Sequence, residues 1–297
     1  MNTKISIIVP AHNEVENIPL LINEFHKIKL KDYEVIIIDD GSTDDTYLEA
    51  NKLVSKNKFL KVIRHKRKRG ITDALISGVD AAAGDIIVFF PADLQYLPEE
   101  ISKLTDKINE GYDIVTGWKT GKYEKWFVSG IYNTLSRKLF NIPVHDLNSI
   151  KAFTKEVFYK IPLRKDWHRY MVVLAWEQGF NVAEVKVTLY PRKYGKSKFG
   201  GIGRVFIGVL DLLAVKFQIS FMRKPMLFFG TTGGILLVLT FIIGAIELYF
   251  RFVLLKGFRP MLYLIMFLGL SGLIFFVLGF LAEAIAGIQD EIKKIKK

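Results

Sequence analysis

The sequence contains no cysteine among its 297 residues. Disulfide bonds and thiol chemistry are therefore excluded, and the absence agrees with a protein that works in the cytoplasm. The first ten residues, MNTKISIIVP, also lack the basic segment and the long apolar core of a signal peptide. We therefore expect the large N-terminal part of the chain to remain in the cytoplasm.

Charge is absent from two long runs near the C-terminus, 226–246 and 261–282. As a helix, each run is about 30 Å long, which is enough to cross the apolar core of a bilayer. They predict transmembrane helices at 225–250 and 261–284, followed by a charged cytoplasmic tail at 285–297. The alternative is a pair of buried core helices, but runs this apolar on every side are uncommon in soluble proteins.

Positive charge is concentrated just before these runs. The formal net charge is +12, yet residues 1–185 are almost balanced, whereas 186–224 carry nine Lys or Arg against one acidic residue. A basic segment next to a membrane span attracts anionic headgroups or a lipid-linked phosphate. Nucleic acid is the competing partner, but no nucleic-acid-binding module is recognisable, so we expect none. The chain is predicted to be a multi-pass protein of the cell membrane.

The first 115 residues alternate between strand and helix patterns. Short β-branched or aromatic runs at 4–10, 33–39, 59–64 and 85–90 are separated by amphipathic stretches, which predicts a mostly parallel sheet covered on both faces. Polar residues follow three of these strands, and the carboxyl ends of parallel strands usually form the ligand site. These residues are Asn13, Glu14, Asp39, Asp40, Asp93 and Gln95.

Carboxylates beside helix N-termini suit a nucleotide, because they can bind ribose, base or a divalent metal while backbone N–H groups bind phosphate. Each segment also has a simpler interpretation. The stretch DDGSTDDT can be a helix start capped by Ser42 or Thr43. The stretch RHKRKRG, 64–70, can be a solvated loop.

Taken together, the motifs resemble those of glycosyltransferase family 2, and within it the polyisoprenyl-phosphate glycosyltransferases. The resemblance rests on SIIVPAHNEVENI, VIIIDDGSTDDT, GVDAAAGDIIVFFPADLQYLPEE, HDLNSIKAF, HRYMVVLAWEQGF and PRKYGKSKFGGIGRVFIGVLDLLAVKF. It implies an α/β catalytic domain of the GT-A type at 1–200, a nucleotide-diphosphate sugar as donor and Mg²⁺ or Mn²⁺ as cofactor. It also implies a polyprenyl phosphate acceptor and inversion at the anomeric carbon.

The resemblance also implies roles for individual residues. Asp93 and Asp146 occupy catalytic positions, and Asp93 with Gln95 matches metal ligands. The donor-binding positions are Pro10, His12, Asn13, Glu14, Asp40, Gly70 and Asp93. The positions for the acceptor phosphate are Lys119, Arg137, His168, Arg169, Arg192, Lys193, Lys196 and Lys198. General attraction to anionic lipid is the alternative role for the last four.

One expected ligand is absent, because Pro91 stands where the family usually has the first Asp of an Asp-Ala-Asp triplet. Proline cannot ligate a metal, but it suits the point where a strand ends and the chain turns. Mg²⁺ needs only one or two carboxylates when substrate phosphates take part. We therefore expect an active enzyme that depends on Asp93.

Residues 201–224 are predicted to form a juxtamembrane amphipathic helix. Arg204, Asp211 and Gln218 recur on a narrow polar strip, while the apolar residues face elsewhere. Such a helix would lie in the headgroup plane and bring the active site to a lipid acceptor. A core helix of the catalytic domain is the alternative.

Three other functions are weighed against transfer to a lipid phosphate. A processive polysaccharide synthase shares the fold, but it should carry a Gln-x-x-Arg-Trp motif and further spans, which the sequence lacks. Pro91 leaves open a silent scaffold that binds nucleotide sugars. A small transporter is the third alternative, but the two apolar runs lack the polar midplane residues that transport would need.

The expected partners are the sugar nucleotide, the polyprenyl phosphate and the membrane, with a homo-oligomer as one arrangement.

Overall fold

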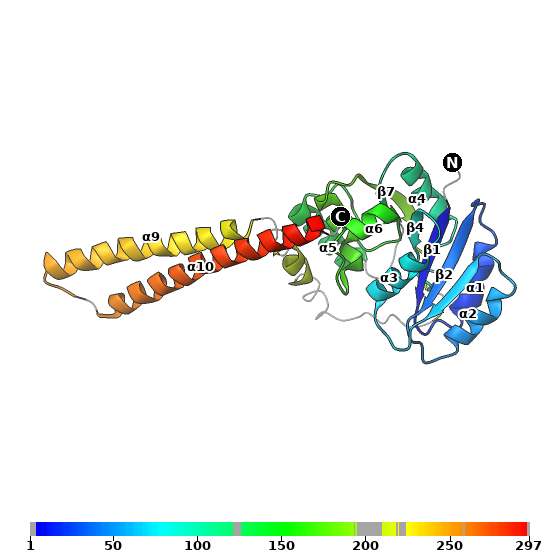
Figure 1. Ribbon diagram of the computed structural model, residues 1–297, viewed down its shortest axis with the longest axis horizontal. Coiled ribbons are helices and arrows are strands. Elements are labelled where there is room, and N and C mark those ends of the chain that lie inside the picture. The colour runs from blue at the N-terminus through cyan, green and yellow to red at the C-terminus, as the bar shows by residue number, and fades with distance from the viewer. Residues whose placement is uncertain are drawn as a thin grey trace. The chain divides into compact units, whose positions relative to one another are not determined.

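The computed structural model describes residues 4–120, 126–192, 194, 210–217, 219, 224–257 and 259–295. The chain divides into two compact units, Met1–Phe206 and Ile207–Lys297. Figure 1 shows the two units, with the sheet in the first and the pair of long helices in the second.

The N-terminal unit is built on a seven-stranded sheet with the order β3-β2-β1-β4-β6-β5-β7. The strands are β1 (Ile5–Ala11), β2 (Tyr33–Asp39), β3 (Leu60–Arg64), β4 (Ile86–Phe89), β5 (Ile114–Thr120), β6 (Lys151–Thr154) and β7 (Val182–Thr188). Neighbours pair in parallel except around β6, which runs antiparallel to β4 and β5. The predicted mostly parallel sheet is confirmed, and so are the four N-terminal strands.

Helices cover both faces of this sheet. They are α1 (Asn17–Phe25), α2 (Thr46–Val54), α3 (Ile71–Ala81), α4 (Glu100–Asn109), α5 (Trp126–Phe140), α6 (Lys155–Lys160) and α7 (Met171–Glu177), with a 3₁₀ turn, η1, at Trp167–Tyr170. Figure 1 shows α3 on one face of β1 and β2 and α1 on the other.

Strand β1 is apolar on both sides because helices pack against both of its faces. Ile7 belongs to the core on the side of α1 and α4. Ile8 points to the other face, where a Cβ on Gly78 of α3 would lie 2.4 Å from its Cγ2 atom. Both isoleucines are fully buried. This double burial explains the continuous apolar run of β1, in contrast to an alternating pattern.

Pro10 is tolerated in this central strand because its pairing with β4 has already ended. The last pair between the two strands is Ile8 with Phe89, two residues before Pro10. On the other side, Pro10 is in register with Ile38 of β2. The N–H group that proline lacks is therefore not needed by β4 at this point.

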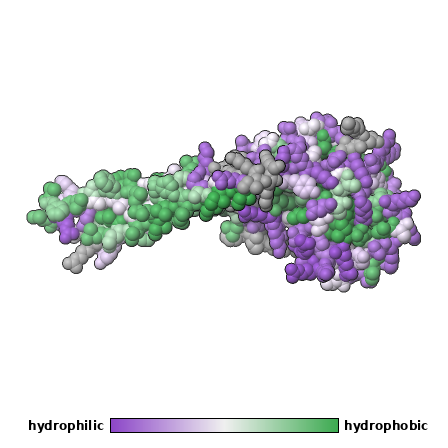
Figure 2. Space-filling view, viewed as in Figure 1, coloured by the Kyte–Doolittle hydropathy of each residue, from purple (hydrophilic) through white to green (hydrophobic). Residues whose placement is uncertain are grey.

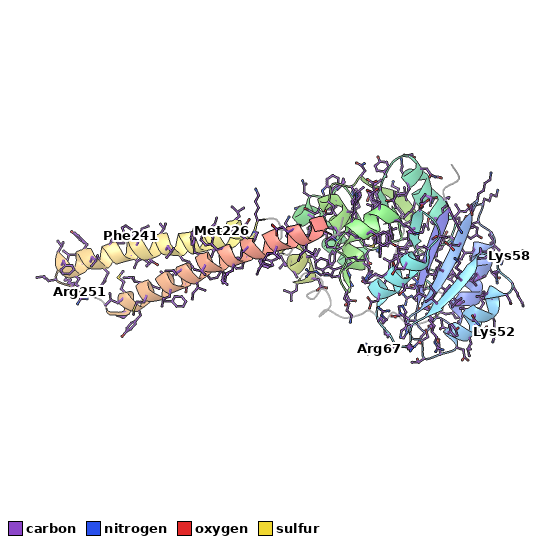
Figure 3. The ribbon with its side chains drawn as sticks, viewed as in Figure 1. Lys52, Lys58, Arg67, Met226, Phe241 and Arg251 are labelled. Atoms are coloured by element: carbon purple, nitrogen blue, oxygen red, sulfur yellow. The ribbon has the colours of Figure 1, made fainter. Side chains whose placement is uncertain are left out.

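The second unit contains α9 (Pro225–Phe252) and α10 (Arg259–Ile295). Two segments, Pro225–Phe252 and Pro260–Ile288, are long and apolar enough to cross a membrane, with mean hydropathies of 2.2 and 2.6. Figure 2 shows that their visible surface is hydrophobic almost throughout, whereas the N-terminal unit is largely hydrophilic. In Figure 3, Met226 and Arg251 mark the two ends of α9, and the exposed Phe241 lies between them.

Helices α9 and α10 approach closely where glycines face each other. A Cβ on Gly233 would lie 2.7 Å from the carbonyl oxygen of Gly272 and 2.7 Å from the backbone nitrogen of Phe276. Small residues of this kind let two helices pack through their backbones, as helices in lipid commonly do. At one end of the pair, the backbone N–H of Met226 donates to the Glu283 carboxylate over 3.1 Å.

The predicted amphipathic helix at 201–224 lies mostly outside the described residues. Its described part, 210–217, is helical. Leu212 and Val215 are buried, while Leu210, Leu213 and Phe217 are about half exposed. The three exposed residues follow a spacing of three and four, so they form one apolar stripe along the helix.

Candidate active site

The carboxyl ends of β1, β2, β4, β5 and β7 meet at one edge of the sheet. Because β6 runs in the opposite direction, its first residue, Lys151, pairs with Phe89 at the end of β4. The loop that precedes β6 and carries Asp146 therefore reaches the same edge as Asp93, which follows β4. The structure thus brings Asp93 and Asp146 to one edge.

The loops after β1 and β2 are locked together by side chains that the sequence analysis considered as helix caps. The Ser42 hydroxyl accepts a hydrogen bond from the backbone N–H of Asn13 over 2.9 Å, and the Asn13 side chain accepts one from Thr43 N–H over 2.9 Å. Glu14 N–H donates to the Thr46 hydroxyl. Helix α2 begins only at Thr46, so the interpretation of Ser42 or Thr43 as its cap is wrong.

Asp40 holds the segment 65–70 against the end of β2. Its Oδ1 atom accepts from the backbone N–H of Arg69 and its Oδ2 atom from that of Gly70, both over 2.8 Å. His65 Nδ1 lies 2.8 Å from Oδ1, and its Nε2 lies 3.0 Å from the Ser77 hydroxyl. Burial would raise the pKa of Asp40, but the hydrogen bonds from His65 and the two backbone groups lower it overall. Asp40 is therefore an anion that shapes the loop.

Gly41 allows the 65–70 loop to approach. Its φ angle is +64°, and a Cβ at this position would lie 2.5 Å from the backbone carbon of Arg67 and the backbone nitrogen of Lys68. The contact leaves the side chain of Arg67 extended into solvent, as Figure 3 shows. The solvated-loop interpretation of RHKRKRG is thus correct for 66–69 and wrong for the buried His65.

The loop after β4 presents polar and apolar side chains alternately. Leu94 and Tyr96 are buried, and the Tyr96 hydroxyl lies 3.1 Å from that of Ser149. Asp93 and Gln95, the intervening residues, are less buried. Leu94 has a φ angle of 56°, a conformation that is costly for a branched residue and is retained where the surroundings impose it. Pro91 ends the strand, and the turn that follows displays Asp93.

Arg192, which follows β7, binds this displayed carboxylate. Its Nη2 atom lies 2.6 Å from Asp93 Oδ2 and 3.4 Å from Gln95 Oε1. Asp93 Oδ1 accepts from the backbone N–H of Gln95 over 3.3 Å. A backbone hydrogen bond from Tyr190 N–H to the Gln95 carbonyl, 2.8 Å long, joins the two segments. Both oxygens of Asp93 thus have partners within the protein.

The side-chain oxygens of this loop fit part of the coordination sphere of a divalent metal, which other ligands would complete. A carboxylate and a carboxamide oxygen, from Asp93 and Gln95, are the hard oxygen ligands that Mg²⁺ and Mn²⁺ accept. Among the residues the structure describes, no group of three or more His, Asp or Glu side chains could hold a metal. The protein therefore offers a partial coordination sphere here.

Asp146 is buried and paired with Lys119. Lys119 Nζ lies 3.2 Å from Asp146 Oδ2 and donates to the Asn148 carbonyl over 3.0 Å. Asp146 Oδ1 accepts from Asn148 N–H over 2.9 Å. The arrangement suits a carboxylate that orients a lysine and its loop, because both oxygens are engaged.

Lys151 places a buried amino group next to this pair. It is 1 % exposed, and its Nζ donates to the Ser149 carbonyl over 2.8 Å. Burial lowers the pKa of Lys151 to about 7, with Asp146 opposing this effect and Lys119 and Arg169 adding to it. A nearby anion would stabilise the charged form of a lysine that is buried in this way.

His168 and Arg169 lie close to Lys151 but differ in charge. Burial, together with Lys151 and Arg169, lowers the pKa of His168 to about 3. His168 is therefore neutral near pH 7, and it lies 3.3 Å from the Thr72 hydroxyl. The Nε atom of Arg169 is buried and has no hydrogen-bond partner among the described residues. Arg169 can offer charge to an anion, whereas His168 can offer only a neutral hydrogen bond.

The remaining predicted residues are less informative. Arg137 is exposed on α5, and no hydrogen bond or ion pair joins it to another described residue. His12 follows β1 at the same edge of the sheet and is half-buried. Lys193, Lys196 and Lys198 lie outside the described residues.

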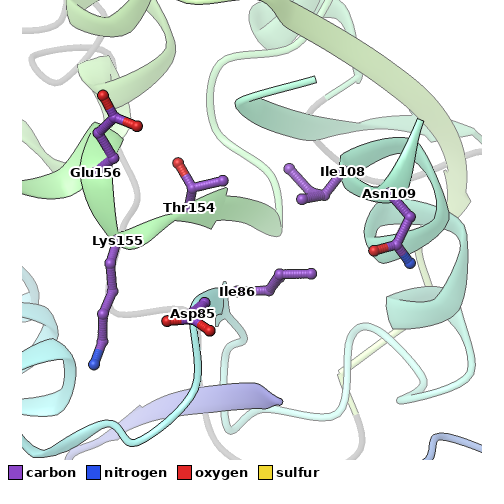
Figure 4. A pocket seen from close by; sticks show the side chains of 7 residues that line it. All are labelled: Asp85, Ile86, Ile108, Asn109, Thr154, Lys155 and Glu156. Atoms are coloured by element: carbon purple, nitrogen blue, oxygen red, sulfur yellow. The ribbon is translucent and has the colours of Figure 1, made fainter. Parts of the chain in front are cut away.

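A cavity of about 330 Å³ lies at the opposite edge of the sheet. Figure 4 shows its lining, which comes from the start of β4, the end of β6, the start of α6 and the end of α4; the residues are Asp85, Ile86, Ile108, Asn109, Thr154, Lys155 and Glu156. Lys155 Nζ donates to the Ala82 carbonyl over 2.6 Å. None of the predicted site residues lines this cavity.

Lys151 and His65 lie among the site residues but were not predicted from the sequence. Lys151 stands in an apolar strand, SIKAF, and a lysine among buried neighbours is a signal of a functional charge. His65 precedes a run of exposed cations, and no local sequence pattern distinguishes it from them. Its role depends on Asp40, which lies 25 positions earlier.

Residues 6–160 match the model of the family described as "Glycosyl transferase family 2". A dodecaprenyl-phosphate galacturonate synthase of Rhizobium johnstonii is 30% identical over 95% of this chain and 88% of its own length. A dolichol-phosphate mannosyltransferase of Pyrococcus furiosus is 33% identical over 67% of this chain and 60% of its own.

A solved glucosyl-3-phosphoglycerate synthase of Mycobacterium tuberculosis, in complex with Mg²⁺ and uridine diphosphate, is similar in fold. It is 21% identical, with a TM-score of 0.57 over 71% of this chain and 79% of its own. The likeness supports the GT-A fold of the N-terminal unit. With its family match over more than half its length, and with its polar site at the carboxyl edge of a GT-A sheet, the chain belongs to glycosyltransferase family 2.

Proposed function

We propose that this glycosyltransferase transfers a sugar from a nucleotide-diphosphate sugar to the phosphate of a polyprenyl phosphate, with inversion at the anomeric carbon. The observation that carries the proposal is the 30% identity to a dodecaprenyl-phosphate galacturonate synthase, because the match covers 95% of the chain and so includes the two apolar helices. A relative of the catalytic unit alone would not support a lipid acceptor.

The acceptor needs little chemical activation. A lipid phosphate is already largely anionic near neutral pH, so it can attack the sugar carbon without a strong general base. Asp146 is not poised to act as a general base, because Lys119 and the Asn148 N–H group already contact its two oxygens. The task of the enzyme is then to align two phosphorylated substrates and to stabilise the charge that develops on the leaving diphosphate.

Different residues at the edge of the sheet serve the nucleotide, the phosphate and the metal. The interlocked loops of Asn13, Ser42 and Asp40 form the side for the nucleotide. Lys119, Lys151 and Arg169 supply positive charge for a phosphate. Asp93 and Gln95 would hold a divalent metal, which would neutralise charge on the donor diphosphate when bound.

The second unit supports a membrane lipid as the acceptor. Two helices long and apolar enough to cross a bilayer suit a substrate that never leaves it. The apolar stripe of Leu210, Leu213 and Phe217 suits a helix lying at the headgroup level. With this arrangement the catalytic unit works in the cytoplasm, beside the inner leaflet.

The direct test is transfer of radiolabel from UDP- and GDP-sugars to a polyprenyl phosphate by the full chain in detergent or nanodiscs. We expect an organic-soluble, acid-labile product with one donor class, and none from Asp93→Asn. A parent protein that binds a sugar nucleotide but transfers nothing from any donor would refute the proposal and favour a scaffold.

The donor can be narrowed before the assay by thermal stabilisation. A ligand that binds only the folded state raises the apparent melting temperature, by an amount that grows with its concentration relative to Kd. Screening a panel of UDP- and GDP-sugars should therefore identify the nucleotide and the sugar together. Asp40→Asn is the matched control, because it should reduce the stabilisation by removing the anion that holds the 65–70 loop.

A further inference from the structure

The guanidinium of Arg192 contacts the side-chain oxygens of Asp93 and Gln95, the two groups that would hold a metal ion here. The ion pair is 2.6 Å long and only partly exposed, at 25% for the Arg192 side chain and 13% for that of Asp93. The same Nη2 atom also lies 3.4 Å from Gln95 Oε1. The guanidinium therefore contacts both side-chain oxygen ligands that the described loop after β4 offers to a metal.

Because residue 91 is Pro where the family usually has Asp, the ion pair between Arg192 and Asp93 matters for metal binding. An Asp at 91 would leave a second carboxylate beside a guanidinium of single charge, and that carboxylate could attract a metal. With Pro91, the described loop has one carboxylate, and one guanidinium balances it. A charge-assisted hydrogen bond between partly buried groups is stronger than a surface ion pair, because water screens it less.

Local geometry keeps Arg192 in place. The hydrogen bond from Tyr190 N–H to the Gln95 carbonyl anchors the chain two residues before Arg192. Leu94, buried with a φ angle of 56°, fixes the loop that carries Asp93. The pairing thus joins two segments, 190–192 and 93–95, that are held by other contacts as well.

We infer that Arg192 is the resident cation of Asp93 in the donor-free protein, so that a divalent metal can bind there only when the guanidinium is displaced. Since the donor diphosphate provides oxygens for both the metal and a guanidinium, it favours the exchange. Arg192 then becomes available to phosphate oxygens, including those of the acceptor, for which the resemblance implies a contact with this residue. This inference rests on the proposed function for the donor, but it can be tested without any sugar transfer.

The test measures Mn²⁺ binding to the purified full chain without donor, from the free Mn²⁺ signal in electron paramagnetic resonance. The parent should bind Mn²⁺ weakly, and Arg192→Gln should bind one ion about tenfold more tightly, which corresponds to about 1.4 kcal/mol. Addition of UDP or GDP should reduce the difference between parent and variant. Arg192→Lys, which keeps a charge, should fall between them.

Two controls make the result specific. The double variant Asp93→Asn with Arg192→Gln should lose the gained site, because the carboxylate is gone. Arg64→Gln removes a guanidinium from another strand-end carboxylate, since Arg64 Nε lies 3.2 Å from Asp39 Oδ2, and it should leave Mn²⁺ affinity unchanged. Equal Mn²⁺ affinity in the parent and Arg192→Gln would overturn the inference, as would a gain that persists without Asp93. Neither outcome would bear on whether the enzyme transfers sugar.

Discussion

Replacing Lys151 with methionine should stabilise the folded protein at neutral pH and at the same time impair sugar transfer. Lys151 is 1% exposed, and burial lowers its pKa from 10.5 to about 7. Lys119, Arg169 and the neutral His168 lie near it, with Asp146 as the opposing carboxylate. Methionine fills a similar volume without the charge. Its thioether cannot attract a phosphate.

The sign and size of the effect follow from proton linkage. Between pH 7 and 10.5 the unfolded chain binds a proton at Lys151 that the folded chain has lost, so the stability of the parent rises with pH across this range. Below pH 7 both states are protonated, and the full cost of the buried charge remains. The pKa difference corresponds to at most about 5 kcal/mol, and loss of the hydrogen bond to Ser149 offsets about 1 kcal/mol of the gain in the variant.

The assay is the apparent melting temperature of the full chain in one detergent at pH 6, 8 and 10. Lys151→Met should melt roughly 8 °C or more above the parent at pH 6, and the gap should narrow towards pH 10. Lys155→Met is the matched control, because Lys155 also donates to a backbone carbonyl but lies at the opposite edge of the sheet. If Lys151→Met melts below the parent at pH 6, or if its advantage is the same at every pH, then the buried-charge reasoning is wrong. A gain in stability without loss of transfer would refute the role at the phosphate.

Three further predictions concern other parts of the chain. Gly41→Ala should weaken donor-nucleotide binding at least tenfold by calorimetry, because its Cβ would lie 2.5 Å from the backbone of Arg67 and displace the 65–70 loop; unchanged affinity would show that the loop does not shape the nucleotide site. Asp93→Asn should abolish transfer, whereas Pro91→Asp should keep activity and lower the Mn²⁺ concentration needed for half-maximal rate; a fully active Asp93→Asn would disprove the metal assignment. Cysteines introduced as Lys256→Cys and Ile295→Cys into this cysteine-free chain should react with a membrane-impermeant maleimide from opposite sides of sealed vesicles, and same-side labelling would contradict the two-span topology.

The first four strands of the sheet were predictable because their signals are local. Strands β1, β2, β3 and β4 are short apolar runs, and the polar residues that follow them must meet at one edge of a parallel sheet. The two apolar helices were equally evident, since apolar runs of this length without charge seldom occur outside a membrane span.

The contacts that complete the site could not be predicted, because each joins residues far apart in the chain. The antiparallel direction of β6, which brings Asp146 to the edge, depends on the route of the chain between β5 and β6. The pairing of Asp93 with Arg192 spans 99 positions. His65 became recognisable only once its burial was known, because it stands in a run of exposed cations.

The strand order β3-β2-β1-β4-β6-β5-β7 also has a consequence for how such enzymes can recombine. All strands before residue 85 lie on one side of a seam between β1 and β4, and all later strands lie on the other. The two strands at the seam are in register over four residue pairs, from Ile5 with Ile86 to Ile8 with Phe89. Exchanging residues 4–84 for those of a relative would therefore leave every pairing among β4, β5, β6 and β7 intact. Under the proposed function, chimeras cut at Gly84 would exchange the loops of Asn13, Ser42 and Asp40 while keeping those of Asp93 and Asp146. A nucleotide preference that moves with residues 4–84 would show that the two sides of the site can be inherited as separate blocks.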